Sequence, residues 1–100
     1  MNKMVVTMTA KVGKTREAIA SLKALGDYAR SKFDSKGDAY MQVFGGTSGT
    51  FYVIVDYKDL ATAQAMSAKA MADEKYMTLL EKASEALIAP PTLAFLQLIQ

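Results

Sequence analysis

Four side chains within one stretch of the sequence are able to do chemistry together: Tyr40, Gln42, Tyr52 and Asp56. A tyrosine hydroxyl and a glutamine amide each donate and accept hydrogen bonds, and a carboxylate can act as a base. These residue types predict a site that binds a small apolar or aromatic molecule. If the site is catalytic, we expect Tyr40, Tyr52 and Asp56 to orient the substrate and take a proton from it.

Each of the four candidates also has a purely structural explanation. The tyrosines suit a packed core in which only the hydroxyl reaches solvent. Asp56 suits the end of a strand, solvated or paired with a lysine such as Lys58. Gln42 suits an exposed edge, where its amide meets water. Both interpretations remain open at the level of sequence.

The residue types that are missing exclude much chemistry. The 100 residues include no cysteine, histidine or tryptophan, so the chain has no thiolate nucleophile, no disulfide and no histidine ligand for haem or zinc. The glycines at 45, 46 and 49 do not form a phosphate-binding motif in front of a helix. We therefore expect neither a cofactor nor a metal.

Charge and hydropathy favour a soluble protein. The net charge of +2 predicts no strong attraction to nucleic acid. The sequence contains no apolar run near the roughly 20 residues of a membrane span, and its first residues do not resemble a signal peptide. We expect a cytoplasmic protein that forms a single domain over residues 1–100 and has no nucleic-acid or membrane partner.

The four candidate site residues lie on a predicted hairpin from Ala39 to Tyr57. Two apolar segments flank Thr47–Ser48, and glycines on both sides supply the backbone freedom that a tight turn needs. A two-residue turn there pairs Phe44 with Phe51. This register places Tyr52 and Asp56 on one face, together with Met41, and Tyr40 and Gln42 on the other.

The rest of the chain alternates between strand and helix patterns. Asp59 and Asp73 each stand where an N-cap aspartate would begin a helix, and Gly26 within the first helix suggests close contact with the sheet. Pro90 and Pro91 end the last helix. The predicted elements are a strand at 3–12, a helix at about 14–33, a turn at 34–38, helices beginning after Asp59 and Asp73, and a strand at 92–100.

The order strand, helix, strand, strand, helix, strand is typical of the ferredoxin-like α+β fold. Right-handed crossovers then give a four-stranded antiparallel sheet in the order 4-1-3-2, with the helices on one face. An RNA-recognition motif has the same order, but the strand Gly49–Tyr57 lacks that module's leading basic residue and spacing. We therefore predict no RNA binding.

A sheet covered on one face only needs a partner for the other. The strand at 92–100 carries apolar residues on both sides although it lies at an edge, and an exposed apolar edge favours aggregation unless it is covered. We therefore predict a homodimer that forms through the open sheet face and this fourth strand.

The order of elements and the segment VIVDYKDLATAQ resemble the dimeric α+β-barrel superfamily, and within it the antibiotic-biosynthesis-monooxygenase-like domains. Asp56, Tyr57 and Asp59 match the acidic residue, the aromatic residue and the helix cap of many relatives. The resemblance implies a homodimer and, in the monooxygenase branch, catalysis without a cofactor. Met66 stands where many relatives carry a histidine, and the only asparagine is Asn2, so the characteristic asparagine and tryptophan of the monooxygenases have no counterparts.

Three functions follow as hypotheses. The first is a homodimeric α+β-barrel protein that binds a small apolar or aromatic molecule through Tyr40, Gln42, Tyr52 and Asp56. The second is a cofactor-independent, monooxygenase-like enzyme acting on a polyphenol. The third is a structural dimer with no ligand.

Overall fold

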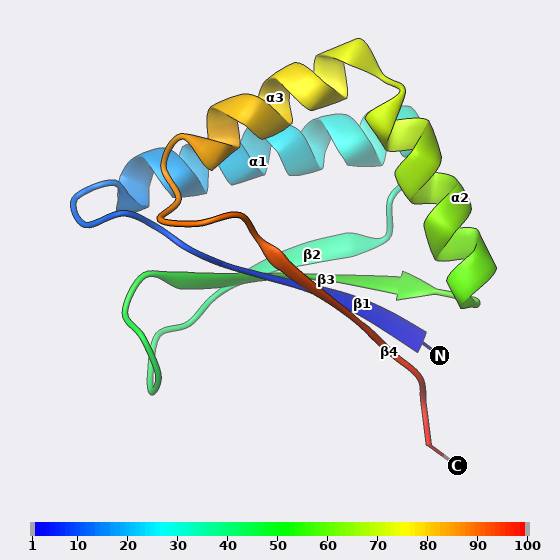
Figure 1. The fold of residues 1–100 in the computed structure, drawn as a ribbon, viewed down its shortest axis with the longest axis horizontal. Helices are drawn as coiled ribbons and strands as arrows, with labels where there is room; N and C mark the ends of the chain where they lie inside the picture. Colours follow the sequence, from blue (N-terminus) through cyan, green and yellow to red (C-terminus); the bar gives the residue numbers. More distant parts are fainter. Residues whose placement is uncertain (1, 100) are drawn as a thin grey trace.

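A computed structural model describes residues 2–99 as a four-stranded antiparallel sheet with three helices on one side (Figure 1). The elements run in the order β1 (Asn2–Thr9), α1 (Thr15–Phe33), β2 (Gly37–Met41), β3 (Thr50–Tyr57), α2 (Leu60–Met71), α3 (Glu74–Ser84) and β4 (Thr92–Leu96). The sheet order is β2-β3-β1-β4, which is the predicted order read from the other edge. The ferredoxin-like α+β fold is confirmed.

The strand β1 is shorter than predicted, because the chain turns between Lys11 and Lys14. The N–H of Lys14 donates to the carbonyl of Lys11 at 2.9 Å, which closes the turn and leaves Val12 fully exposed. Gly13 has a φ of +79° in this turn, a conformation that side chains with a Cβ rarely adopt. α1 then begins at Thr15 and ends at Phe33, close to the predicted bounds.

The predicted register of the hairpin is wrong. β2 ends at Met41, and an eight-residue loop precedes β3, so Tyr40 pairs with Tyr52 and Met41 with Phe51. The ladder closes where the N–H of Gln42 donates to the carbonyl of Thr50 at 2.9 Å. A shift of three residues moves every β2 side chain to the other face relative to β3. Tyr40 and Tyr52 therefore share one face.

Two capping aspartates begin α2 and α3, as the sequence predicts, but α3 ends at Ser84 and not at Pro90, because the chain after it continues in tighter turns. A side-chain oxygen of Asp59 accepts from the N–H of Thr62 at 2.8 Å, and one of Asp73 accepts from the N–H of Tyr76 at 2.8 Å. Each bond satisfies a backbone donor in the first turn that has no partner within the helix. The break between the two helices lets α2 lie against β3 while α3 packs along α1 (Figure 1).

The core lies between the sheet and the helices. Met8 of β1 and Phe51 of β3 pack against Ala18 of α1 and against Ala86 and Leu87, which follow α3. Small side chains on the helical side allow the layers to approach closely, and Ala18 is completely buried. Because side chains alternate along a strand, the neighbouring residues of β1 and β3 point to the face that no helix covers.

Gly26 does not contact the sheet, contrary to expectation. A Cβ at this position would meet the guanidinium of Arg30, at 3.4 Å. Gly37 is the glycine that meets the sheet closely, because a Cβ there would stand 2.9 Å from a methyl carbon of Val55. Glycine therefore matters for packing at the start of β2 and not in the middle of α1.

The fourth strand is also shorter than predicted, since β4 ends at Leu96. Leu93 and Phe95 oppose Val6 and Met4 on the helical face, while Ala94 opposes Val5 on the other face. This alternation explains the apolar residues on both sides of the strand. Residues 97–99 continue as a tail beyond the sheet, and Gln100 lies outside the described residues.

Candidate functional site

The four candidate residues gather along the face of the sheet that lies opposite the helices, here called the open face. Tyr40 and Tyr52 are direct cross-strand partners there, and Asp56 lies four residues further along β3 on the same side. Val5, Thr7 and Ile54 fill the middle of the face, where β1 pairs with β3. Thr92, Ala94 and Leu96 of β4 lie on the same face, and so does the exposed Asp38 of β2, which pairs with Ile54. The open face therefore combines an apolar centre with two tyrosine hydroxyls.

Gln42 joins the tyrosine pair to the loop that follows β2. The hydroxyl of Tyr52 donates to Oε1 of Gln42 at 2.6 Å, and Nε2 of Gln42 donates to the carbonyl of Gly45. The amide is thus used for holding the loop against the sheet. The Tyr52 oxygen keeps its acceptor lone pairs for another donor.

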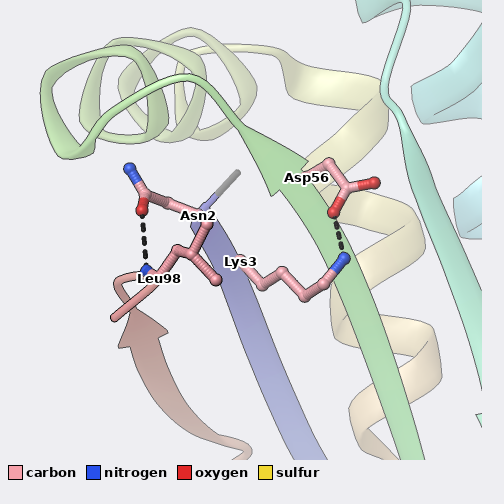
Figure 2. Close-up of polar contacts among 4 residues, drawn as sticks. All are labelled: Asn2, Lys3, Asp56 and Leu98. Atoms are coloured by element: carbon pink, nitrogen blue, oxygen red, sulfur yellow. Dashed lines mark hydrogen bonds and ion pairs between the residues drawn. The ribbon is translucent and has the colours of Figure 1, made fainter. Parts of the chain in front are cut away.

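Asp56 is paired with Lys3, which lies directly opposite it in the β1–β3 register (Figure 2). Nζ of Lys3 and Oδ1 of Asp56 are 2.5 Å apart, and both side chains are about half exposed. The hydrogen bond to Asp56 raises the pKa of the Lys3 ammonium, and Tyr40 lies close enough to add to this effect. The predicted partner Lys58 is not the one used, because cross-strand register places Lys3 at this position.

A groove of about 170 Å³ runs between α2 and the strands β1 and β4, on the helical side of the sheet. Its apolar walls come from Met4, Leu60, Leu93 and Phe95, and small or polar residues of α2 complete it: Ala63, Gln64 and Ser67. The α2 residues recur at three- and four-residue intervals, which is the spacing of one helical face. A cavity of about 150 Å³ is large enough for benzene. The groove, which is open to solvent, therefore has about the volume of a cavity that holds one aromatic ring.

A larger hollow of about 350 Å³ lies between α1 and α3. Alanine, serine and charged side chains form most of its lining, including Glu17, Lys82 and Glu85. We interpret it as the furrow between two helices that meet through small residues. Neither of these two hollows is lined by Tyr40, Gln42, Tyr52 or Asp56.

An aromatic cluster between α1 and α3 has no counterpart in the sequence-based analysis. Phe33 packs edge-on against Tyr28 and Tyr76, with ring centroids 6.1 and 5.9 Å apart. The hydroxyl of Tyr28 donates to the two oxygens of Asp73 at 2.8 and 3.0 Å. Burial raises the pKa of Tyr76, and burial together with the nearby Tyr76 raises that of Tyr57. The cluster joins α1 to the start of α3. The residues that it joins across the two helices lie far apart in the sequence, so no local pattern indicates this contact.

Residues 2–99 contain neither a metal-binding carboxylate cluster nor a membrane-spanning helix. No group of three or more aspartate or glutamate side chains gathers where a metal ion could be held. No helix within these residues combines the length and the apolar character needed to cross a bilayer.

Comparisons with known proteins agree on the fold. No protein-family model matches the sequence, and no curated protein matches it significantly. A NIPSNAP domain protein from Burkholderia xenovorans superimposes with a TM-score of 0.84 over 99% of this chain and 95% of its own, at 17% identity. A protein described as an antibiotic biosynthesis monooxygenase superimposes with a TM-score of 0.77 over the whole of both chains, at 15% identity.

The chain shares their fold. A protein from Agrobacterium tumefaciens has it too, with a TM-score of 0.80 over 97% of this chain and 92% of its own, at 17% identity. The predicted resemblance to the ferredoxin-like fold of the monooxygenase-like domains is therefore confirmed. The superpositions establish the ferredoxin-like architecture, and at this identity they carry no information on activity.

Proposed function

We propose that the chain is a homodimer that binds a small apolar or aromatic molecule. The observation that carries the assembly is the open face, whose apolar centre of Val5, Ile54 and Tyr52 has no helix against it. A second copy stacked on this face would remove these side chains from water. Tyr40, Gln42, Tyr52 and Asp56 then lie between the two sheets, where their polar atoms can bind one another or those of the second copy.

The energetics favour this assembly. A typical stable interface buries roughly 800 Å² on each partner, and apolar burial contributes about 25 cal/mol per Å². Even if only half of that area is apolar, the gain is comparable to or larger than the roughly 4–15 kcal/mol cost of association. The Lys3–Asp56 pair neutralises its own charge at the edge of the face, so stacking does not bring an unpaired charge from this pair into the interface.

The groove between α2 and β4 is the place that best suits the ligand. It is bounded by large apolar side chains on the strands and by Gln64 and Ser67 on α2, a combination typical of sites that hold an apolar body and orient it through a few polar groups. Its size limits the buried part of the ligand to about one ring. The stacked sheets do not close it, because it opens on the helical side.

Two measurements test the proposal. Light scattering after gel filtration at micromolar concentration should give the mass of two chains, and native mass spectrometry of protein from its own host should retain a small ligand. A monomer would contradict the assembly. A ligand-free dimer that gives no chemical-shift changes with toluene in the α2 amide groups would favour the purely structural function.

An enzymatic function is the second candidate, and the fold shared with a protein described as an antibiotic biosynthesis monooxygenase favours it. In this alternative, Tyr40 and Tyr52 orient a polyphenol, and Asp56 takes a proton once Lys3 shifts away. Oxygen consumption with a panel of polyphenols tests it. Undiminished turnover in the triple variant Tyr40→Phe, Tyr52→Phe, Asp56→Asn would remove these residues from the mechanism.

A further inference from the structure

Two segments leave the sheet on the side opposite the helices, one toward each end of the longest axis (Figure 1). One is the loop of residues 42–49 between β2 and β3, and the other is the tail of residues 97–99 after β4. We call them the loop arm and the tail arm. A body stacked on the open face must lie between them.

The two arms carry exposed apolar side chains. Phe44 is 94% exposed and Val43 85% on the loop arm, and Ile99 is 93% exposed on the tail arm beside the half-exposed Leu98. These include three of the four most exposed large apolar residues in the described part of the chain. These side chains have almost no packing partners within the chain, so they contribute little to the stability of the monomer.

Asn2 holds the tail arm in place (Figure 2). Its Oδ1 accepts from the N–H of Leu98 at 3.2 Å, and its Nδ2 donates to the carbonyl of Lys58 at 3.0 Å. One amide thus ties the tail arm to β1 and to the turn that precedes α2. The direction in which the tail leaves the sheet is therefore fixed by a specific contact.

We propose that the loop arm and the tail arm grip a second copy of this chain, and that Asn2 is the positioning residue for the tail arm. The inference rests on the proposed dimer and extends it beyond the sheet face. The Cα atoms extend 37 Å along the longest axis and 20 Å along the line of sight of Figure 1. The open face lies within these dimensions, and their product is close to the roughly 800 Å² per partner of a stable dimer.

The composition of the arms favours a protein partner over a lipid surface. Residues 42–49 and 97–99 include no lysine, arginine, aspartate or glutamate. Segments that bind membrane surfaces typically combine apolar residues with lysine and arginine for anionic headgroups. Neutral apolar arms around a face with an apolar centre match a second copy, which presents the same arms and the same face.

Substitutions on the arms test the proposal without disturbing the monomer, because the replaced side chains are exposed. We expect Phe44→Ser and Leu98→Ser each to raise the dimer dissociation constant about tenfold or more in sedimentation equilibrium. Met71→Ser is the matched control, because Met71 is equally apolar and exposed but lies at the end of α2. It should leave the dissociation constant unchanged.

The role of Asn2 has its own pair of variants. Asn2→Leu removes both hydrogen bonds and should weaken the dimer, while Asn2→Asp keeps the acceptor for the Leu98 N–H and should retain most of the affinity. Hydrogen exchange of the Leu98 amide should quicken only in Asn2→Leu. Equal dissociation constants for both variants and the wild type would exclude Asn2 as a positioning residue.

The outcomes separate this inference from the proposed dimer. If the wild type is a dimer and neither Phe44→Ser nor Leu98→Ser changes its dissociation constant, the arms do not contact the second copy. The proposed stacking of the open faces would be unaffected by that result. A wild-type monomer overturns both. A monomer that sediments with phosphatidylglycerol vesicles, and loses this on Phe44→Ser, identifies the arms as membrane contacts instead.

Discussion

Asp59 and Asp73 cap consecutive helices, but only Asp73 also binds a residue of another element. Asp59 accepts from the backbone and the hydroxyl of Thr62, both within its own helix. Asp73 accepts from the N–H of Tyr76 and from the Tyr28 hydroxyl of α1. The same residue type in the same local pattern therefore stabilises a single helix in one case and the packing of two helices in the other.

We predict that Asp73→Ala lowers the urea midpoint of unfolding more than Asp59→Ala does. Both variants lose a cap, but Asp73→Ala also leaves the Tyr28 hydroxyl without its acceptor. A double-mutant cycle with Tyr28→Phe should show coupling for Asp73 and none for Asp59. Equal midpoints for the two alanine variants would contradict the added role of Asp73.

The same two aspartates predict how stability responds to acid. Hydrogen bonds, chiefly from the Thr62 hydroxyl to Asp59 and from the Tyr76 N–H to Asp73, lower both pKa values in the folded chain. Their contribution is complete above the unfolded aspartate pKa of about 3.9 and is lost as pH falls through the folded values. We expect the urea midpoint to fall below about pH 4, and to fall less steeply in the double variant Asp59→Asn, Asp73→Asn.

The sequence allowed some residue-scale features to be predicted and concealed others. Both N-caps were predicted from an aspartate in front of a helical pattern, because each capping hydrogen bond joins residues only three positions apart. The Lys3–Asp56 pair joins positions 53 residues apart, and the choice of Lys3 over Lys58 depends on cross-strand register. Tyr28 and Asp73 are likewise distant in sequence, so only the packed helices bring them together.

At the scale of elements, two glycines have opposite roles. A Cβ at Gly26 would meet only the flexible end of Arg30 at 3.4 Å, whereas one at Gly37 would stand 2.9 Å from the buried Val55. We predict that Gly26→Ala stabilises the chain by up to about 1 kcal/mol through helix propensity, and that Gly37→Ala destabilises it by about 1–3 kcal/mol through overpacking. Thermal and urea unfolding of the two variants check both signs.

The groove gives a second prediction at this scale. Ser67→Phe should fill the groove from α2 and abolish the shift changes that toluene causes in the α2 amide groups, with the fold retained. Ala65→Phe is the control, since Ala65 is exposed on α2 but does not line the groove. Unchanged toluene binding in Ser67→Phe would place the binding site elsewhere.

The hairpin shows where element-level prediction fails. Alternating apolar residues predicted two strands correctly, and the helical patterns gave the start of each helix within one residue, but α3 ends at Ser84, before the predicted end at Pro90. The register failed because the sequence between Gln42 and Gly49 allows several turns, and apolar residues such as Val43 and Phe44 extend the strand pattern into the loop. The candidate tyrosines were thus recognised, but their common face was not.

At the scale of the whole molecule, the proposed dimer predicts a stability that depends on concentration. Because association stabilises only the folded chain, the melting temperature should rise with protein concentration. Leu96→Glu places a charge on the open face at an exposed position of β4, and its melting temperature should be independent of concentration. The helix-side control Met71→Glu should behave like the wild type, and a flat dependence in the wild type would contradict the dimer.

The fold itself was the most predictable property at this scale, since the order of elements and the handedness of crossovers leave few sheet topologies. Assembly depends on a face that the sequence reveals only as apolar alternation, without the shape that a partner requires. The two arms illustrate this limit, because their direction depends on Asn2 and on the length of the loop after Met41.

The hydrogen bond between Asn2 and Leu98 has a consequence for engineering. Since β1 and β4 are neighbours, the beginning and the end of the described chain lie side by side, and a short glycine-serine linker can connect them. The chain can then be reopened within the exposed segment 43–48. Such a circular permutant should keep the sheet intact while moving the new termini to the site of the loop.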